Sequence, residues 1–211
     1  MSLNQEIIAA LKKEGCNIVG FADIRELPAE HTKGLPSAII MATTYAPKAL
    51  WDKLNDTQKQ AIQEDWGKGD PLERYNKAVK ALLKENKYKR NTTYSSMQLT
   101  YKTLATIAGI GWIGRCALLV TKAQGPAVRF TAVLTNAPLE CGTPITTSQC
   151  ITDCTTCQTS CPANAIKGGQ WERGIHRDQF FDVEACKSGR SKCDAVCIAN
   201  CPYTMKGNLF T

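Results

Sequence analysis

The chain has 211 residues and a mass of 23.1 kDa, a length that suits one or two domains of ordinary size. Its composition, with 43% hydrophobic, 21% charged and 7% aromatic residues, excludes a disordered chain, a collagen-like repeat and a coiled coil. The formal net charge of +7 would indicate a nucleic-acid partner, unless bound metal thiolates offset part of it.

Two observations bear on location. The longest apolar run, Ala38 to Ala42, is far shorter than the ~18–20 residues that a membrane span needs. The first residues, Met1 to Gln5, lack the basic and apolar regions of a signal peptide. We therefore expect a cytoplasmic protein with no membrane partner.

The first 140 residues mix helical and extended patterns. Apolar residues recur at helical spacing in four segments, which predicts helices over 5–14, 57–65, 71–83 and 98–107. Short apolar runs bounded by turn residues predict buried strands over 17–22 and 37–43. Two further runs, 117–121 and 127–134, are joined through Gly125-Pro126 and predict a hairpin. This irregular order indicates an α/β or α+β domain over 1–140, followed by a second domain over 141–211.

Cysteine is unusually abundant, and its placement is uneven. Of eleven cysteines, eight fall between Cys150 and Cys201, and the others are Cys16, Cys116 and Cys141. A disulfide framework is typical of exported proteins with small cores, whereas clustered cysteines in a cytosolic chain indicate metal binding. Two iron–sulfur cubes held by eight thiolates would lower the net charge to about +3, which weakens the case for nucleic acid.

The eight cysteines form two similar motifs, each with a fourth cysteine followed by proline. This is the bacterial ferredoxin pattern, in which three cysteines of one motif share a cluster with the fourth cysteine of the other. Three thiolates on one tight loop reach three corners of a cube, so the fourth corner needs a residue from elsewhere. The predicted ligand sets are Cys150, Cys154, Cys157 and Cys201 for one [4Fe–4S] cluster, and Cys161, Cys186, Cys193 and Cys197 for the other.

Zinc is the alternative metal, because four-cysteine zinc sites also use closely spaced thiolates. Zinc ribbons typically use two Cys-x2-Cys pairs, and the duplicated Cys-Pro ending has no role in that design. The two histidines, His31 and His176, offer little for a mixed site. Among the remaining cysteines we interpret Cys16 as a buried small residue, Cys116 as a packing residue and Cys141 as a weak alternative ligand.

Residues 109–114 formally match the dinucleotide fingerprint G-x-G-x-x-G. That fingerprint requires a strand before it and a helix after it, and an acidic residue ~20 positions further on. Here a helical pattern precedes and a strand pattern follows, and Lys122 to Ala132 contains no acid. We therefore interpret the segment as a helix-to-strand turn packed by Trp112.

Three segments in the same order carry a family resemblance. AGIGWIGRCALLV (108–120), VLTNAPL (133–139) and the double Cys-Pro motif resemble epoxyqueuosine reductase and its shorter relatives, and more distantly the reductive dehalogenases. The opening LKKEGCNIVGFAD (11–23) is also similar to the start of that family. The resemblance covers nearly the whole chain.

The resemblance implies an α+β fold, in which a nitroreductase-like α/β N-terminal domain holds a corrinoid (cobalamin). It implies a C-terminal double-cluster ferredoxin domain that passes electrons to the cobalt. The implied partners are an electron donor, such as a flavodoxin, ferredoxin or reductase, and a corrinoid or corrinoid protein. Corrinoid contacts are expected at Ser95, Leu119, Val120 and Phe130.

The sequence also departs from this family. Ser95 stands at or near the position of the family's proton-donating aspartate, before Leu104-Ala105, and no carboxylate occurs between Asn86 and Leu139. Serine is a poor proton donor beside a carboxylic acid, which counts against epoxide deoxygenation. The chain ends nine residues after Pro202, without the family's helical-repeat extension, which counts against transfer RNA as a partner.

Three hypotheses follow for function. The first is a corrinoid-dependent reductase of an unknown acceptor. The second is an electron-transfer or corrinoid-reducing partner protein without substrate chemistry of its own, which the missing acid favours. The third is a structural zinc protein. Metal content distinguishes the third hypothesis from the others, and cobalamin binding distinguishes the first from an electron carrier.

Overall fold

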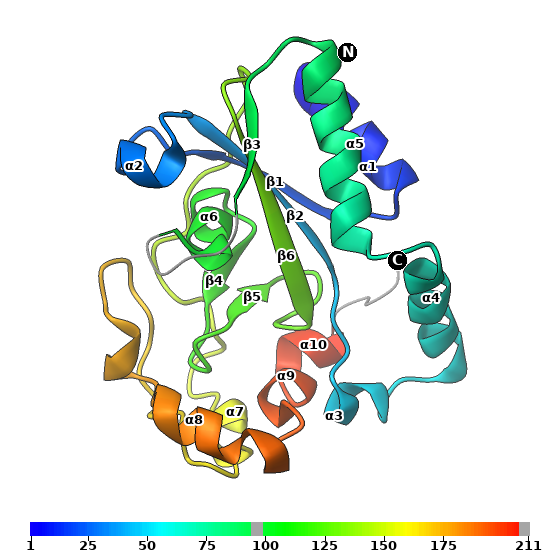
Figure 1. Ribbon diagram of the computed structural model, residues 1–211. Coiled ribbons are helices and arrows are strands. Elements are labelled where there is room, and N and C mark those ends of the chain that lie inside the picture. The colour runs from blue at the N-terminus through cyan, green and yellow to red at the C-terminus, as the bar shows by residue number, and fades with distance from the viewer. Residues whose placement is uncertain (94–98, 207–211) are drawn as a thin grey trace. The chain divides into compact units, whose positions relative to one another are not determined.

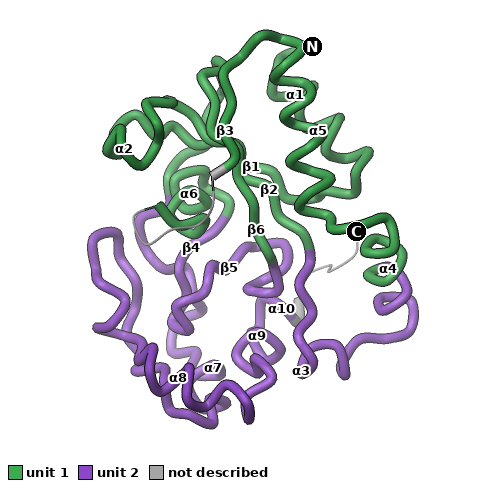
Figure 2. The backbone as a smooth tube through the Cα atoms, viewed as in Figure 1, with its two compact units in different colours: residues 1–43, 62–110, 129–144 green, residues 44–61, 111–128, 145–211 purple. Residues whose placement is uncertain are grey.

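The computed structural model describes residues 1–93 and 99–206, and the chain divides into two compact units (Figure 2). Unit 1 comprises residues 1–43, 62–110 and 129–144, and unit 2 comprises 44–61, 111–128 and 145–211. Both units are therefore discontinuous in sequence. The cysteine-rich segment folds together with two segments that precede residue 129, and the domain boundary at residue 140 stays a prediction.

Figure 1 labels the elements of both units. The strands and helices lying wholly or mainly in unit 1 are α1 (Leu3–Lys13), β1 (Ile18–Asp23), α2 (Ala29–Thr32), β2 (Ser37–Thr44), α5 (Pro71–Glu85), β3 (Arg90–Thr93), α6 (Tyr101–Ile107) and β6 (Val128–Thr135). Helix α4 (Asp56–Gly67) begins in unit 2 and ends in unit 1. Unit 2 holds α3 (Lys48–Trp51), β4 (Gly111–Ile113), β5 (Leu119–Thr121), α7 (Thr156–Thr159), η1 (Arg177–Gln179), α8 (Val183–Gly189), η2 (Arg190–Lys192), α9 (Val196–Ala199) and α10 (Pro202–Lys206).

The sheet of unit 1 has four strands in the order β1-β2-β6-β3. Strands β1 and β2 are antiparallel, with Phe21 opposite Ile39. Strands β3 and β6 are also antiparallel, with Asn91 opposite Leu134. Strand β2 is buried along almost its whole length, as its unbroken apolar run predicts for a central strand.

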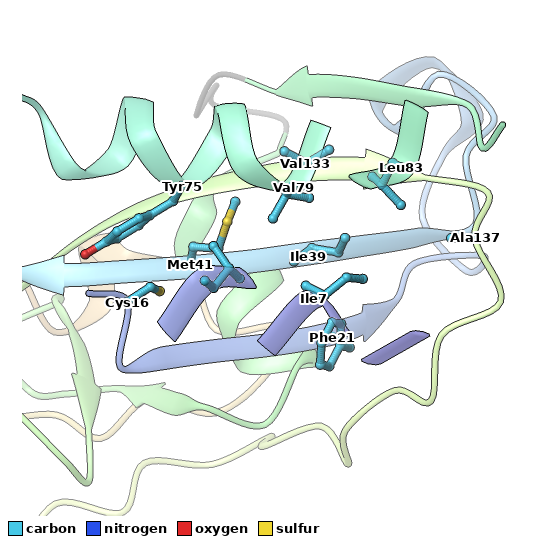
Figure 3. Packing of buried hydrophobic residues seen from close by; sticks show 11 residues of the cluster. Ile7, Cys16, Phe21, Ile39, Met41, Tyr75, Val79, Leu83, Val133 and Ala137 are labelled. Carbon is cyan, nitrogen blue, oxygen red and sulfur yellow. The ribbon is translucent and has the colours of Figure 1, made fainter. Parts of the chain in front are cut away.

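Helices α1 and α5 contribute the core of unit 1 together with the sheet (Figure 3). Alternate residues of β1 face opposite sides of the sheet. Phe21 belongs to the cluster with α1 and α5, whereas Gly20 faces the end of α6, where an added Cβ would lie 2.6 Å from Cγ2 of Ile110. The buried cluster consists of Ile7, Leu11, Cys16, Phe21, Ile39, Met41, Tyr75, Val79, Leu83, Val133 and Ala137.

Local signals explain where the long helices begin. Ser2 and Gln5 form a capping box at the start of α1, and Asp70 accepts a hydrogen bond from the Leu72 amide, with Pro71 in the first turn of α5. The helices predicted over 5–14, 57–65, 71–83 and 98–107 are present as α1, α4, α5 and α6, and the strands predicted over 17–22 and 37–43 are β1 and β2.

The predicted hairpin of 117–121 with 127–134 is wrong. Strand β5 pairs with β4 instead, with Val120 opposite Trp112, and β6 lies in the four-stranded sheet. Gly111 allows this pairing, because a Cβ there would lie 2.5 Å from the carbonyl oxygen of Val120. The loop after β5 closes on itself through two bonds between the amides and carbonyls of Thr121 and Gly125.

None of the helices that the structure describes is both long enough and apolar enough to span a bilayer.

Candidate metal centre

The first group of cysteines surrounds a pocket in unit 2. Cys150, Cys154, Cys157 and Cys201 line it together with Cys116. Cys157 lies in the first turn of α7, and Cys201 immediately precedes α10. The lining also includes Gly114, Arg115, Val120, Ile151, Pro202 and Tyr203. Three cysteines of the first motif and the last cysteine of the second motif therefore face one space.

The second group consists of the four other cysteines of the two motifs. Burial raises the pKa of Cys197 to about 12, and the neighbouring thiols of Cys193, Cys157, Cys186 and Cys161 raise it further. Burial also raises the pKa of Cys186, which interacts electrostatically with Cys193 and Cys161. Cys161 is therefore among the thiols that act electrostatically on Cys186 and Cys197.

A hydrogen bond connects the ends of the two motifs. Ser160 precedes Cys161, Asn200 precedes Cys201, and the Asn200 side-chain amide donates to Ser160 Oγ at 3.0 Å. The short helices α7 and α9, which end next to these residues, also pack against one another. The two Cys-Pro turns therefore lie side by side, which is the arrangement that lets each fourth cysteine reach the other motif. The ligand sets themselves stay a prediction.

Left-handed residues lie in the two Cys-x3-Cys segments of the motifs, Cys150 to Cys154 and Cys193 to Cys197. Asp153 has φ 59° before Cys154, and Asp194 and Ala195 have φ 44° and 58° between Cys193 and Cys197. Left-handed backbone reverses the chain over few residues, and it costs an L-residue roughly 1–2 kcal/mol relative to right-handed backbone. Each segment therefore turns within a few residues at a cost in backbone strain.

The turn that contains Gly114 forms one wall of the first pocket. A Cβ on Gly114 would lie 2.7 Å from Val120 Cγ2, 3.5 Å from Cys150 Sγ and 3.6 Å from Cys116 Sγ. The Cys116 thiol donates a hydrogen bond to Cys157. This bond, assisted by the positive charge of Arg115, lowers the pKa of Cys157 to about 7 although burial opposes the shift.

Three buried polar atoms in unit 2 have no hydrogen-bond partner within the part of the chain that the structure describes. They are Arg115 Nε, Trp112 Nε1 and Thr204 Oγ1. Trp112 packs edge-on against Tyr203, with ring centroids 5.0 Å apart, and the Tyr203 hydroxyl donates to the Gln149 carbonyl at 2.8 Å. Arg115 and Tyr203 both line the first pocket. An anionic group in that pocket would give the buried Arg115 donor a partner.

The spacing of the thiols also bears on the kind of metal. A zinc ion holds thiolates at about 2.3 Å, which brings the sulfur atoms within roughly 4 Å of one another. In the described residues, no group of three or more His, Cys, Asp or Glu side chains is close enough to hold a single ion. The choice between zinc and an iron–sulfur cluster stays a prediction.

The other predicted site residues belong to different segments of the chain. Leu119 is buried in β5 of unit 2, and Val120 beside it lines the first cysteine pocket. Phe130 is half-buried in β6, Cys141 is exposed in unit 1, and Ser95 lies outside the described residues. Corrinoid contact by Ser95, Leu119, Val120 and Phe130 stays a prediction.

Among the pocket residues that sequence reasoning missed are Arg115, Cys116 and Tyr203. Tyr203 could have been found from the sequence, because it lies two positions after the predicted ligand Cys201. Arg115 and Cys116 follow a glycine turn far from both motifs in sequence, and only the β4–β5 hairpin brings that turn to the cysteines. Tertiary pairing was therefore needed to find them.

No protein-family model matches the chain. A tetrachloroethene reductive dehalogenase of Sulfurospirillum multivorans is 37% identical over 122 residues, which is 50% of this chain and 24% of that protein. The chain thus spans about a quarter of the length of this curated relative.

Solved structures share the fold over nearly the whole chain. Epoxyqueuosine reductase from Streptococcus thermophilus has a TM-score of 0.64 at 18% identity, with 97% of this chain and 67% of that chain covered. A reductive dehalogenase, whose structure suggests a mechanism for B12-dependent dehalogenation, has a TM-score of 0.63 at 18% identity, with 94% and 31% covered. The chain is therefore an α+β protein like epoxyqueuosine reductases and reductive dehalogenases, with their fold over nearly its whole length.

Proposed function

We propose that the chain is an iron–sulfur reductase, in which two [4Fe–4S] clusters pass single electrons to a bound cobalamin that reduces an acceptor. The observation that carries this proposal is the first cysteine pocket. It combines four thiols from two motifs with a buried, unpaired Arg115 donor. This donor set fits an anionic cluster, because the thiolates supply the ligands and the guanidinium offsets negative charge.

Each proposed cluster takes three cysteines from one motif and one cysteine from the other. Cys150, Cys154, Cys157 and Cys201 would hold the first cluster, and Cys161, Cys186, Cys193 and Cys197 the second. Such clusters supply one-electron transfer when bound. The protein contributes burial of the ligands and the hydrogen bond between Ser160 and Asn200, which keeps the two groups adjacent. Adjacent clusters suit transfer of electrons from one to the other.

Cobalamin enters the proposal through the likeness to reductive dehalogenases and epoxyqueuosine reductases. We place it in the predicted N-terminal domain, residues 1–140, which the resemblance makes nitroreductase-like, with residues 141–211 as the ferredoxin domain. Among the residues expected to contact it, Val120 already belongs to the first cysteine pocket. A corrinoid there would lie next to the first cluster.

We further propose that electrons come from a small redox protein, such as a flavodoxin, a ferredoxin or a reductase. The absence of any carboxylate between Asn86 and Leu139 favours a second candidate function. In that case the chain is an electron-transfer protein that reduces a corrinoid or corrinoid protein and has no substrate chemistry of its own.

The test is anaerobic purification, followed by iron, sulfide and zinc analysis and absorption spectra before and after hydroxocobalamin and a reductant. The proposal expects about eight iron and about eight sulfide per chain, bleaching of the cluster absorption on reduction, and a perturbed cobalamin spectrum. Eight iron with no cobalamin response would favour the electron carrier. Stoichiometric zinc without sulfide would overturn both redox functions.

A further inference from the structure

Arg115 has an unusual environment for a charged residue. It is 8% exposed, and among the side chains that the structure describes it is the only charged one that is buried. It lies between Gly114 and Cys116, in the connection from β4 to β5, and lines the pocket of the first four cysteines. Its Nε–H is buried without a hydrogen-bond partner among the described residues, and leaving a buried polar group unpaired is costly.

No carboxylate of the described residues supplies a partner for Arg115. None of the ion pairs there includes Arg115. Arg115 interacts electrostatically with the sulfur of Cys157, a predicted ligand of the first cluster. Arg115 therefore has no counter-ion among the described carboxylates, and it lines the pocket of the first four cysteines.

We propose that the positive charge of Arg115 raises the reduction potential of the first cluster alone. The inference rests on the proposed function, because it needs a cluster at Cys150, Cys154, Cys157 and Cys201. A nearby positive charge stabilises the reduced cluster, which carries one more negative charge than the oxidised cluster. Hydrogen bonds and charge near the sulfurs are established ways to set such potentials.

The second group of cysteines provides an internal comparison. One cation there is Arg190, which interacts electrostatically with Cys186 but is exposed to solvent. Water screens an exposed charge, whereas a buried charge acts through a medium of low dielectric constant. Arg115 and Arg190 are thus the same residue type beside two cysteine groups, and they differ in burial.

The experiment is a reductive titration of the protein loaded with both clusters, followed by electron paramagnetic resonance, for four chains. These are the wild type, Arg115→Gln, Arg115→Lys and the control Arg190→Gln. We expect Arg115→Gln to lower one of the two midpoint potentials by at least 59 mV, a tenfold change for a one-electron couple. Arg115→Lys keeps the charge, so both of its midpoint potentials should differ from those of the wild type by less than 59 mV. The same is expected for Arg190→Gln, because the charge that it removes is exposed to solvent.

The outcomes separate this inference from the function on which it depends. Unchanged midpoints in Arg115→Gln, with about eight iron bound, would overturn the role of Arg115 and leave the iron–sulfur function intact. A shift in Arg115→Lys as large as that in Arg115→Gln would also overturn it, because charge would then not be the cause. A wild-type chain that binds no iron and no sulfide would overturn the proposed function itself.

Discussion

The thiol of Cys116 is hydrogen-bonded to the thiol of Cys157. Cys116 follows a glycine turn between two short strands, and Cys157 belongs to the first cysteine motif, 41 positions further along the chain. Cys116 is only 5% exposed and lines the same pocket as four predicted cluster ligands. The residue interpreted from sequence as a packing residue therefore also contacts the candidate metal centre.

The first prediction concerns the reactivity of Cys157 in metal-free protein. Cys116→Ala removes the donor that stabilises the Cys157 thiolate, so the pKa of Cys157 rises from about 7 toward the ordinary value of 9.0. The thiolate is the nucleophile, and its fraction at pH 7 falls by more than tenfold as the pKa rises. We expect alkylation of Cys157 by iodoacetamide at pH 7 to slow accordingly, as measured by peptide mass spectrometry.

Cys116→Ser is the matched control, because a serine hydroxyl restores a donor at the same position. It should retain most of the reactivity of Cys157. Equal alkylation rates in the wild type and Cys116→Ala would show that the hydrogen bond does not set the pKa of Cys157.

The second prediction concerns cluster content. Cys157→Ala removes a ligand of the first cluster only, so the purified protein should fall from about eight to about four iron per chain. Cys141→Ala is the control, since Cys141 is exposed in unit 1, where its thiol donates to the Leu139 carbonyl. It should keep about eight iron. If both variants lose the same amount, the assignment of ligands to the first pocket is wrong.

Much of unit 1 could be predicted from sequence, because its signals are local. Apolar spacing identified α1 and α5, and the unbroken apolar run identified the buried strand β2. The four-residue strand β3 has the polar sequence Arg-Asn-Thr-Thr and gave no such signal. Its pairing with β6 depends on tertiary structure, which overrides weak local preference.

The candidate metal centre could be predicted in part for a related reason. Cysteine spacing and the two Cys-Pro endings identified both groups of thiols, since these are patterns of residue type along the chain. The sequence prediction paired residues 117–121 with 127–134, whereas the structure pairs β5 with β4. The sequence did not identify the correct partner, because apolar residues occur on both sides of 117–121. With that pairing misassigned, nothing placed Arg115 beside the cysteines.

The third prediction tests the close packing of the Gly114 turn. In Gly114→Ala the new Cβ would lie 2.7 Å from Val120 Cγ2 and 3.5 Å from Cys150 Sγ. Val120 is buried and short, so it cannot move far without displacing the pocket wall. We expect a loss of about 1–3 kcal/mol in the free energy of unfolding, typical of overpacking, and lower iron content.

Gly67→Ala is the matched substitution, because nothing lies within 4 Å of the Cβ that it adds at the end of α4. Its iron content should equal that of the wild type. Thermal unfolding and iron analysis of the two variants give the comparison, and equal iron content in both would contradict a tight wall at Gly114.

The fourth prediction concerns alkaline stability of unit 1, where Cys16 is buried beside Tyr75 in the core (Figure 3). Burial raises the pKa of Cys16 from 9.0 to about 12. Between these values the unfolded chain has lost the thiol proton and the folded chain still holds it, so stability falls as pH rises. The loss is about 1.4 kcal/mol per pH unit, or roughly 2 kcal/mol between pH 8 and pH 10.5.

Cys16→Ala removes this titration, although the lost sulfur costs about 1 kcal/mol at pH 8, as small buried deletions do. The variant should therefore be less stable than the wild type at pH 8 and lose roughly 2 kcal/mol less between pH 8 and pH 10.5. Burial also raises the pKa of Tyr75, but that residue is present in both proteins and cancels in the comparison. Urea unfolding at the two pH values measures the difference. Equal losses in the two proteins would mean that Cys16 ionises in the folded state as readily as in the unfolded chain, which its burial opposes.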